Sequence, residues 1–160
     1  MTSPVSMPAG HAIVATDLDA YENATAAWPT WSPTLTNITN VNGTVVAKYR
    51  QVGKTVDYRF KFSLGSSSAI GTSPKFTLPA TPNSDYVDAS GSCFPIGQAF
   101  LVHAGVATRI GLSVVLTGST ATIFSNNFAT GEASTGITAA APWTWATGDM
   151  LHVWGTYETN

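Results

Sequence analysis

One stretch constrains the fold of this 160-residue chain more than any other: a regular alternation of apolar and polar side chains over residues 55–64. The apolar members of this stretch are Val56, Tyr58, Phe60, Phe62 and Leu64. Successive side chains of a β-strand point to opposite faces of a sheet, so the pattern predicts a strand with one buried and one solvated face. We therefore expect these five residues to lie in the centre of the core.

Short β-like runs separated by Gly, Pro, Ser and Asn fill the chain after Trp28. We expect strands at 31–36, 44–51, 55–64, 75–78, 92–104, 109–117, 120–125 and 148–158. Tight turns at 52–54 and 118–119 should join their flanking runs into hairpins. No helical pattern follows Trp28, and the sequence therefore predicts an all-β fold, an antiparallel β-sandwich or jelly roll.

The first 30 residues have a different character. Residues 1–12 are mostly Pro, Ser, Gly and Ala without a period, which indicates an arm, and a helix signal then begins at Thr16 and ends before Pro29. Its stripe has the spacing of a coiled coil and consists of Val14, Leu18, Tyr21, Thr25 and Trp28. A coiled-coil stem and an amphipathic helix lying on its own domain both explain this stripe. The chain thus divides into an arm and stem (1–30) and a β-domain (31–160).

Charge is scarce in this sequence. Only 10% of the residues are charged, against about 25% in typical domains, and the net charge is -2. Nucleic-acid binding depends on clustered basic residues, and we expect none here. The nearest approach to a cluster is interpreted as the solvated face of a hairpin: Lys48, Arg50, Lys54, Arg59 and Lys61.

The N-terminus lacks a basic start followed by an apolar run, so we expect no signal peptide. No stretch approaches the roughly 20 apolar residues that span a bilayer, and we expect no membrane insertion.

Residues for catalysis or metal binding are dispersed. His11, His103 and His152 are isolated, and neither HExxH nor CxxC occurs, so we expect no metal and no cofactor. The carboxylates considered for a glycosidase pair lie on the wet strand face or mostly in or near turns: Asp57, Asp85, Asp88, Glu132, Asp149 and Glu158. The lone Cys93 lies among apolar residues and is expected to be an inert buried thiol. We therefore expect no catalytic residues and no enzyme activity.

Five tryptophans are many for this length. Trp143 and Trp145 occupy alternate positions after Pro142, so they point the same way if the segment is extended. We favour a core or interface role for this pair, and stacking on a sugar ring of a ligand is the alternative. Trp154 shares a strand face with Met150 and His152.

Four segments together resemble a known group of proteins: GHAIVATDLDAYENAT, AWPTWSPTLTN, NGTVVAKYRQVGKTVDYRFKFSLGSSSAIGTSPKFTLP and WATGDMLHVWGTYE. They are similar to virion proteins of tailed phages that infect actinobacteria, described as minor tail, tail fibre or receptor-binding proteins. The similarity covers nearly the whole chain and is most specific at 43–71 and 145–158. It implies a homotrimeric β-sandwich on the surface of the phage particle, with a helical stem near residues 14–28.

This resemblance also sets the expected partners. The N-terminal arm would contact other virion proteins, and the β-domain would contact a glycan or protein of the host surface through loops such as 65–74 and 126–138. The protein would be made in the host cytoplasm. Because only about a dozen arm residues precede the stem, a capsid decoration protein or head fibre that stabilises the shell is an alternative. A carbohydrate-binding module or small glycan hydrolase is a third hypothesis.

Overall fold

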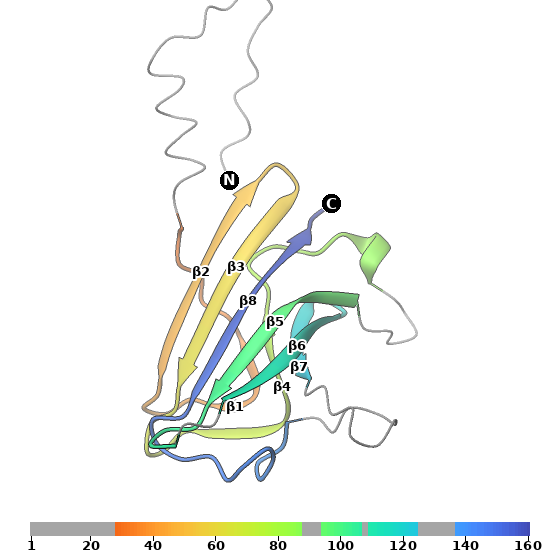
Figure 1. Cartoon of the computed structure of the whole chain (residues 1–160). Coiled ribbons are helices and arrows are strands. Elements are labelled where there is room, and N and C mark those ends of the chain that lie inside the picture. Colours follow the sequence, from red (N-terminus) through yellow and green to blue (C-terminus); the bar gives the residue numbers. More distant parts are fainter. Residues whose placement is uncertain (1–27, 88–93, 107–108, 125–136) are drawn as a thin grey trace, which may run out of the picture.

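The computed structural model describes residues 28–87, 94–106, 109–124 and 137–160, and within these ranges the chain forms eight strands and one short 3-10 turn (Figure 1). The elements are β1 (Leu35–Thr39), β2 (Thr44–Val52), β3 (Thr55–Ser63), β4 (Ala69–Thr77), η1 (Ser84–Tyr86), β5 (Phe94–Val102), β6 (Arg109–Thr117), β7 (Thr120–Phe124) and β8 (Met150–Glu158). The stripe residues Val14, Leu18, Tyr21 and Thr25 lie outside the described ranges.

All described strands belong to one sheet in the order β1-β4-β7-β6-β5-β8-β3-β2. Every neighbouring pair is antiparallel, so the prediction of an all-β antiparallel fold is confirmed. Both predicted hairpins form, β2 with β3 and β6 with β7. Strand β3, next to the edge strand β2, has a second neighbour, β8, which is almost 100 residues away in the sequence.

The sheet curls into a half-barrel, so that strands near its two opposite ends pack against each other. The ring of Phe60 on β3 stacks on the ring of Phe76 on β4, with centroids 4.5 Å apart and planes 8° from parallel. These two strands are not neighbours in the sheet, so only curvature can bring their side chains together. Figure 1 shows β4 and β1 passing behind the row of β2, β3 and β8.

The alternating residues of β3 lie on the concave side of this curl. Val56, Tyr58, Phe60, Phe62 and Leu64 are each at most 4% exposed and belong to one apolar cluster with residues of the other strands. Burying a side chain of this size stabilises the fold by about 1.5–3 kcal/mol. The opposite face of the same strand carries Asp57, Arg59 and Lys61, which are half-buried or exposed.

The two edge strands of the sheet are joined by the segment before β1. Residues 29–31 run along β2, where the Trp31 amide donates to the Ala47 carbonyl at 3.2 Å. The Trp31 indole N–H donates to the carbonyl of Thr77 at the end of β4, also at 3.2 Å, and its ring meets the edge of Tyr49. Trp31 therefore connects the edge strand β2 to β4, the neighbour of the opposite edge strand β1.

Several strand boundaries differ from those expected. The sequence predicts one strand over 31–36, but β1 begins only at Leu35. Between residues 31 and 34 the chain crosses from the edge of β2 to that of β4, and Pro33 has no N–H to donate to a strand pairing. Conversely, β4 begins at Ala69 and not at 75, so the expected loop 65–74 is largely strand. Its strand pairing comes from β1, on which Ile38 lies opposite Ile70.

Two glycines allow β5 and β8 to approach each other closely beneath the ring of Tyr58. Gly97 lies opposite Gly155, which in turn lies opposite Tyr58 on β3. A Cβ atom added at Gly155 would come within 2.1 Å of the Ile96 carbonyl oxygen and 2.7 Å of the Tyr58 hydroxyl. Both positions thus require the absence of a side chain.

We predict that Gly155→Ala lowers the free energy of unfolding by about 3 kcal/mol, because the rigid backbone of Ile96 cannot move away from the new methyl group. Gly111→Ala is the matched control, since nothing lies within 4 Å of the corresponding Cβ position. Urea denaturation measures both variants. Equal stability of the two would contradict the close packing of β5 on β8.

Candidate functional site

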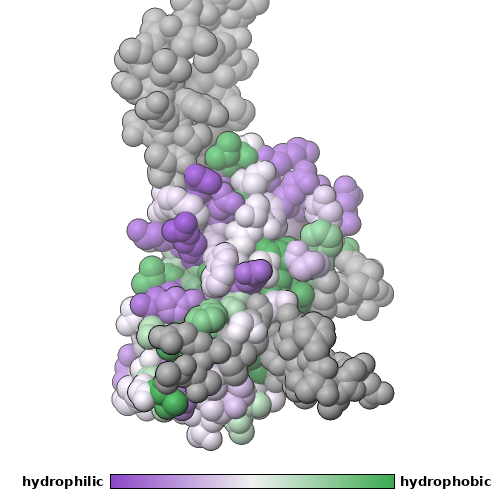
Figure 2. Space-filling model, viewed as in Figure 1, coloured by the Kyte–Doolittle hydropathy of each residue, from purple (hydrophilic) through white to green (hydrophobic). Residues whose placement is uncertain are grey.

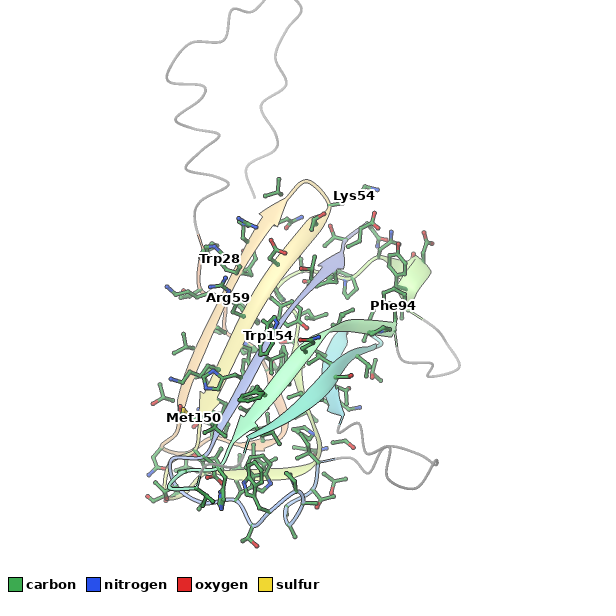
Figure 3. All side chains as sticks on the ribbon, in the orientation of Figure 1. Trp28, Lys54, Arg59, Phe94, Met150 and Trp154 are labelled. Carbon is green, nitrogen blue, oxygen red and sulfur yellow. The ribbon has the colours of Figure 1, made fainter. Side chains whose placement is uncertain are left out.

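A shallow groove of about 710 Å³ lies on the outer, convex side of the sheet. It runs across β2, β3 and β8, and its charged and aromatic lining consists of Trp28, Lys48, Arg59, Lys61, His152 and Trp154. Its volume falls in the range that is usual for ligand sites, about 300–1,000 Å³. Figure 3 shows Trp28, Arg59 and Trp154 on the same side of these strands.

The pairing register explains why these side chains meet. Lys48 on β2 lies opposite Arg59 on β3, and Arg59 lies opposite Trp154 on β8. The next row along the strands places Lys61 opposite His152. Residues directly opposite each other have Cβ atoms about 5 Å apart, and residues two apart on a strand are separated by about 7 Å. Three cations and an indole ring therefore share a patch on the order of 10 Å wide.

Only one cation of this part of the sheet has a carboxylate partner among the described residues. Arg50 contacts Asp57 at 2.6 Å, and Asp57 also accepts a hydrogen bond from the Thr156 hydroxyl at 2.7 Å. The hydrogen bonds from Arg50 and Thr156 hold the pKa of Asp57 below its ordinary value. Lys48, Arg59 and Lys61 form no salt bridge within the described ranges, although the charge of Arg59 also contributes to the lowered pKa of Asp57.

The two tryptophans of the groove, Trp28 and Trp154, differ in whether another side chain lies over the ring. Arg59 lies over the ring of Trp28 at 4.4 Å from its centroid, and Arg50 lies 5.4 Å from the same centroid. Trp28 thus fixes the position of the Arg59 guanidinium by a cation–π contact. Trp154 has no ring contact among the described residues and is 44% exposed. Its indole ring is therefore the free stacking surface of the groove.

His152 is the titratable group of the groove floor. Its neighbours in the register are Lys61 on β3 and Phe100 on β5. Burial, and then the charge of Lys61, lower the pKa of His152 below its ordinary value of 6.5. His152 is consequently neutral at pH 7, and acidification adds a further positive charge to the groove.

We predict that Lys61→Ala raises the pKa of His152 toward 6.5, because one of the two causes of the depression is removed while the burial remains. NMR titration of the His152 ring protons measures the shift. Lys54→Ala is the control: it removes a cation from the turn of the same hairpin, outside the groove, and should leave this pKa unchanged. A pKa of His152 that is insensitive to Lys61 would place the ammonium group away from the imidazole.

A second polar cluster, centred on Asp149, lies at the start of β8. The carboxylate of Asp149 is fully buried and accepts four hydrogen bonds of 2.8–3.0 Å. The donors are the Ala104 and Ala146 amides, the Trp143 indole and His103 Nδ1. These contacts tie the end of β5 and the loop 138–149 to β8.

Trp143 and Trp145, the sequence-predicted aromatic pair, belong to this cluster. Their ring centroids are 5.6 Å apart, and Trp143 stacks on His103 at 4.8 Å. Both rings are half-buried against the core, and the Trp145 indole N–H donates to the Thr138 carbonyl at 2.8 Å. Each indole N–H therefore has an internal partner, an arrangement typical of structural tryptophans.

The chemistry of the Asp149 cluster is structural. Burial raises the pKa of Asp149, but the hydrogen bonds from Ala104, Ala146, His103 and Trp143 together lower it below its ordinary value of 3.8. Because the pKa is lower in the folded chain than in the unfolded chain, the stabilisation is present above pH 3.8 and is lost as the pH falls through the lowered value.

We predict that Asp149→Asn lowers the free energy of unfolding by about 3 kcal/mol, because the amide nitrogen of Asn replaces one of the two acceptor oxygens and faces the two donors that shared it. These are His103 and Ala104 at one oxygen, or Trp143 and Ala146 at the other. Thermal unfolding should show a melting temperature lower by about 10 °C. The exposed Asp85, changed to Asn, should alter stability by less than about 0.5 kcal/mol. A similar small effect at Asp149 would mean that the four hydrogen bonds contribute little.

The remaining residues that the sequence suggests for catalysis or metal binding are not brought together, or they lie outside the described residues. Asp57 and Glu158 form hydrogen bonds to Thr156 and Tyr86, respectively, while His11, Asp88, Cys93 and Glu132 lie outside the described residues. Within the described ranges, no group of three His, Cys, Asp or Glu residues could hold a metal ion. The same ranges contain no helix with the length and apolar character that crossing a membrane requires.

The sequence alone does not predict the groove, although it does predict that several of the residues that line it are on exposed strand faces. The sequence predicts the basic residues of β2 and β3 on the solvated face of a hairpin, and Trp154 and His152 on one face of the last strand. The pairing of β3 with β8, which no local pattern indicates, brings the two sets together. Comparison of the chain with protein-family models, with curated proteins and with solved structures finds no match.

Proposed function

We propose that the protein is a non-enzymatic structural protein of a tailed phage particle, a trimeric fibre or spike whose β-domain attaches to the surface of an actinobacterial host. The observation that carries the proposal is the outer face of β2, β3 and β8. Within the described ranges this face combines three cations that form no salt bridge with exposed apolar side chains, Val46 and Trp154, each 44% exposed. Such a surface is suited to contact with another molecule.

Three of the four described carboxylates support a binding role over a catalytic one, and the fourth, Asp85, is exposed. Asp149 is enclosed by four donors, and Asp57 is held by Arg50 and Thr156. Glu158 accepts a hydrogen bond from the Tyr86 hydroxyl at 3.2 Å. Each of these groups stabilises the fold, and a general acid or base needs instead to face a substrate.

The resemblance to phage virion proteins supplies the finer parts of the proposal. These are a β-sandwich architecture, a helical stem that includes Val14, Leu18, Tyr21 and Thr25, and trimers that contact other virion proteins through the arm. Trp28, expected as the last residue of the stem stripe, is not helical and lines the groove instead. Trp28, the first described residue, lies beside β2 over Arg59, so the proposed stem would join the β-domain next to the groove.

We predict that purified protein, added to host cells before infection, lowers the adsorption of the phage that carries it, because free protein occupies the host sites that the particle needs. Light scattering on the same preparation should give the mass of a trimer. Heat-denatured protein is the control for nonspecific coating of the cells.

Unchanged adsorption, together with capsids that break more readily when the protein is missing, would instead assign it to shell decoration. A monomer in solution and on the particle would contradict the stem.

A further inference from the structure

We infer that the groove between Trp28 and Trp154 binds an acidic oligosaccharide, with a sugar ring on Trp154 and its carboxylate or phosphate on Arg59, Lys61 and Lys48. This inference names the ligand class of the surface on which the proposed function rests. It is independent of whether the protein sits on the tail or on the shell of a particle.

The positive charge of the groove favours a negatively charged ligand. Three of the seven Lys and Arg residues of the chain, Lys48, Arg59 and Lys61, line this one groove, and none of the three forms a salt bridge within the described ranges. Charges within about 8 Å act together at physiological salt. An anion in the groove would neutralise them.

The geometry of the cations suits a carboxylate or a phosphate. Trp28 holds the guanidinium of Arg59 from one side, so its side chain is positioned before a ligand arrives. A fixed guanidinium presents its N–H groups as a fork that matches two oxygens of one anionic group. Lys61, two residues along β3 and thus about 7 Å away along the backbone, supplies a second positive charge on the same face.

The exposed ring of Trp154 indicates that the ligand carries a flat ring next to its anionic group. Trp154 is directly opposite Arg59 in the register and is 44% exposed, although the strand beneath it is well packed. An exposed indole can stack on the apolar face of a sugar while its hydroxyl groups stay in water. A ligand that combines a flat ring face with an anionic substituent uses both Trp154 and Arg59.

The size of the site favours a short saccharide over a nucleic acid or a second copy of this chain. Single-stranded nucleic acids require tracks of about 4–16 nucleotides with several stacking rings, whereas this groove offers 710 Å³ and one free ring within the described residues. The same face of another copy carries the same uncompensated cations and would repel it.

Isothermal titration calorimetry of the full chain tests the inference with matched probes. Trigalacturonate carries carboxylates, and galactotriose of the same linkage is its neutral counterpart; maltotriose 6-phosphate and maltotriose form the phosphate pair. We expect at least one acidic trisaccharide to bind at least about tenfold more tightly than its neutral counterpart, and less tightly as salt is raised. The tighter of the two acidic probes identifies the anionic group. No binding of either acidic probe up to about 1 mM, or equal binding of the neutral sugars, would overturn the inference.

Two variants separate the two parts of the site. Trp154→Ala should weaken the acidic trisaccharide by about tenfold or more and leave the binding of tripolyphosphate, which has no ring, unchanged. Arg59→Ala/Lys61→Ala should weaken both probes by about tenfold or more. The matched controls are Phe94→Ala, an aromatic residue with the same 44% exposure outside the groove, and Lys54→Ala. Melting temperatures establish that each variant is folded, and equal effects of Phe94→Ala and Trp154→Ala would contradict the assignment.

Three further outcomes would show that the groove binds a different partner. Tighter binding of a thymidine hexanucleotide than of either acidic trisaccharide would indicate a nucleic-acid surface. A change of oligomeric state in Arg59→Ala/Lys61→Ala would indicate an interface between copies. A tenfold rise in trisaccharide affinity after Asp17, Asp19 and Glu22 are replaced by Asn, Asn and Gln would indicate that the acidic N-terminal segment of the chain occupies the groove.

Because calorimetry needs neither host nor particle, its result is distinct from that of the adsorption experiment. Sugar binding without competition for adsorption would retain the site and reject the attachment function. Competition for adsorption without sugar binding would support the attachment function and reject the sugar site.

Discussion

The stack of Phe60 on Phe76 is the contact on which the rest of this structure depends. A single sheet with one apolar face must cover that face with something, and the described residues contain no helix or second sheet for this purpose. The sheet therefore covers itself by curling, and β4 packs on β3. Trp31 then joins the two edges by bonding to Ala47 on β2 and to Thr77 on β4. The hydrophobic effect thus sets both the curvature and the closure.

Curling also decides what the other face can do. Because the concave side takes every apolar residue of β3, the convex side receives Asp57, Arg59 and Lys61, and the described residues place no layer over it. Figure 2 shows this face with hydrophilic and apolar residues interspersed over β2, β3 and β8. A side chain as large as Trp154 on such a face is not explained by folding.

Local patterns predicted local structure well. The alternation at 55–64 gave β3 and its buried side, and short turn sequences gave the β2–β3 and β6–β7 hairpins. Pairings between strands far apart in the sequence have no local signature, so neither the β3–β8 ladder nor the groove on it could be predicted. The same limit applies to Asp149, whose donors range from residue 103 to residue 146. It applies equally to residues 69–74, which become strand only because β1 lies beside them.

The uneven distribution of charge has a consequence for the approach of this molecule to another surface. A body whose total charge is slightly negative, but which carries a concentrated positive patch, experiences a torque in an external electric field. Near a negatively charged polymer layer, this torque turns the convex face of β2, β3 and β8 forward before any contact is made. The fraction of collisions in a productive orientation then rises, and it falls as dissolved ions shorten the reach of the field. The few charges of this chain would in this way influence how fast it docks more than how long it stays.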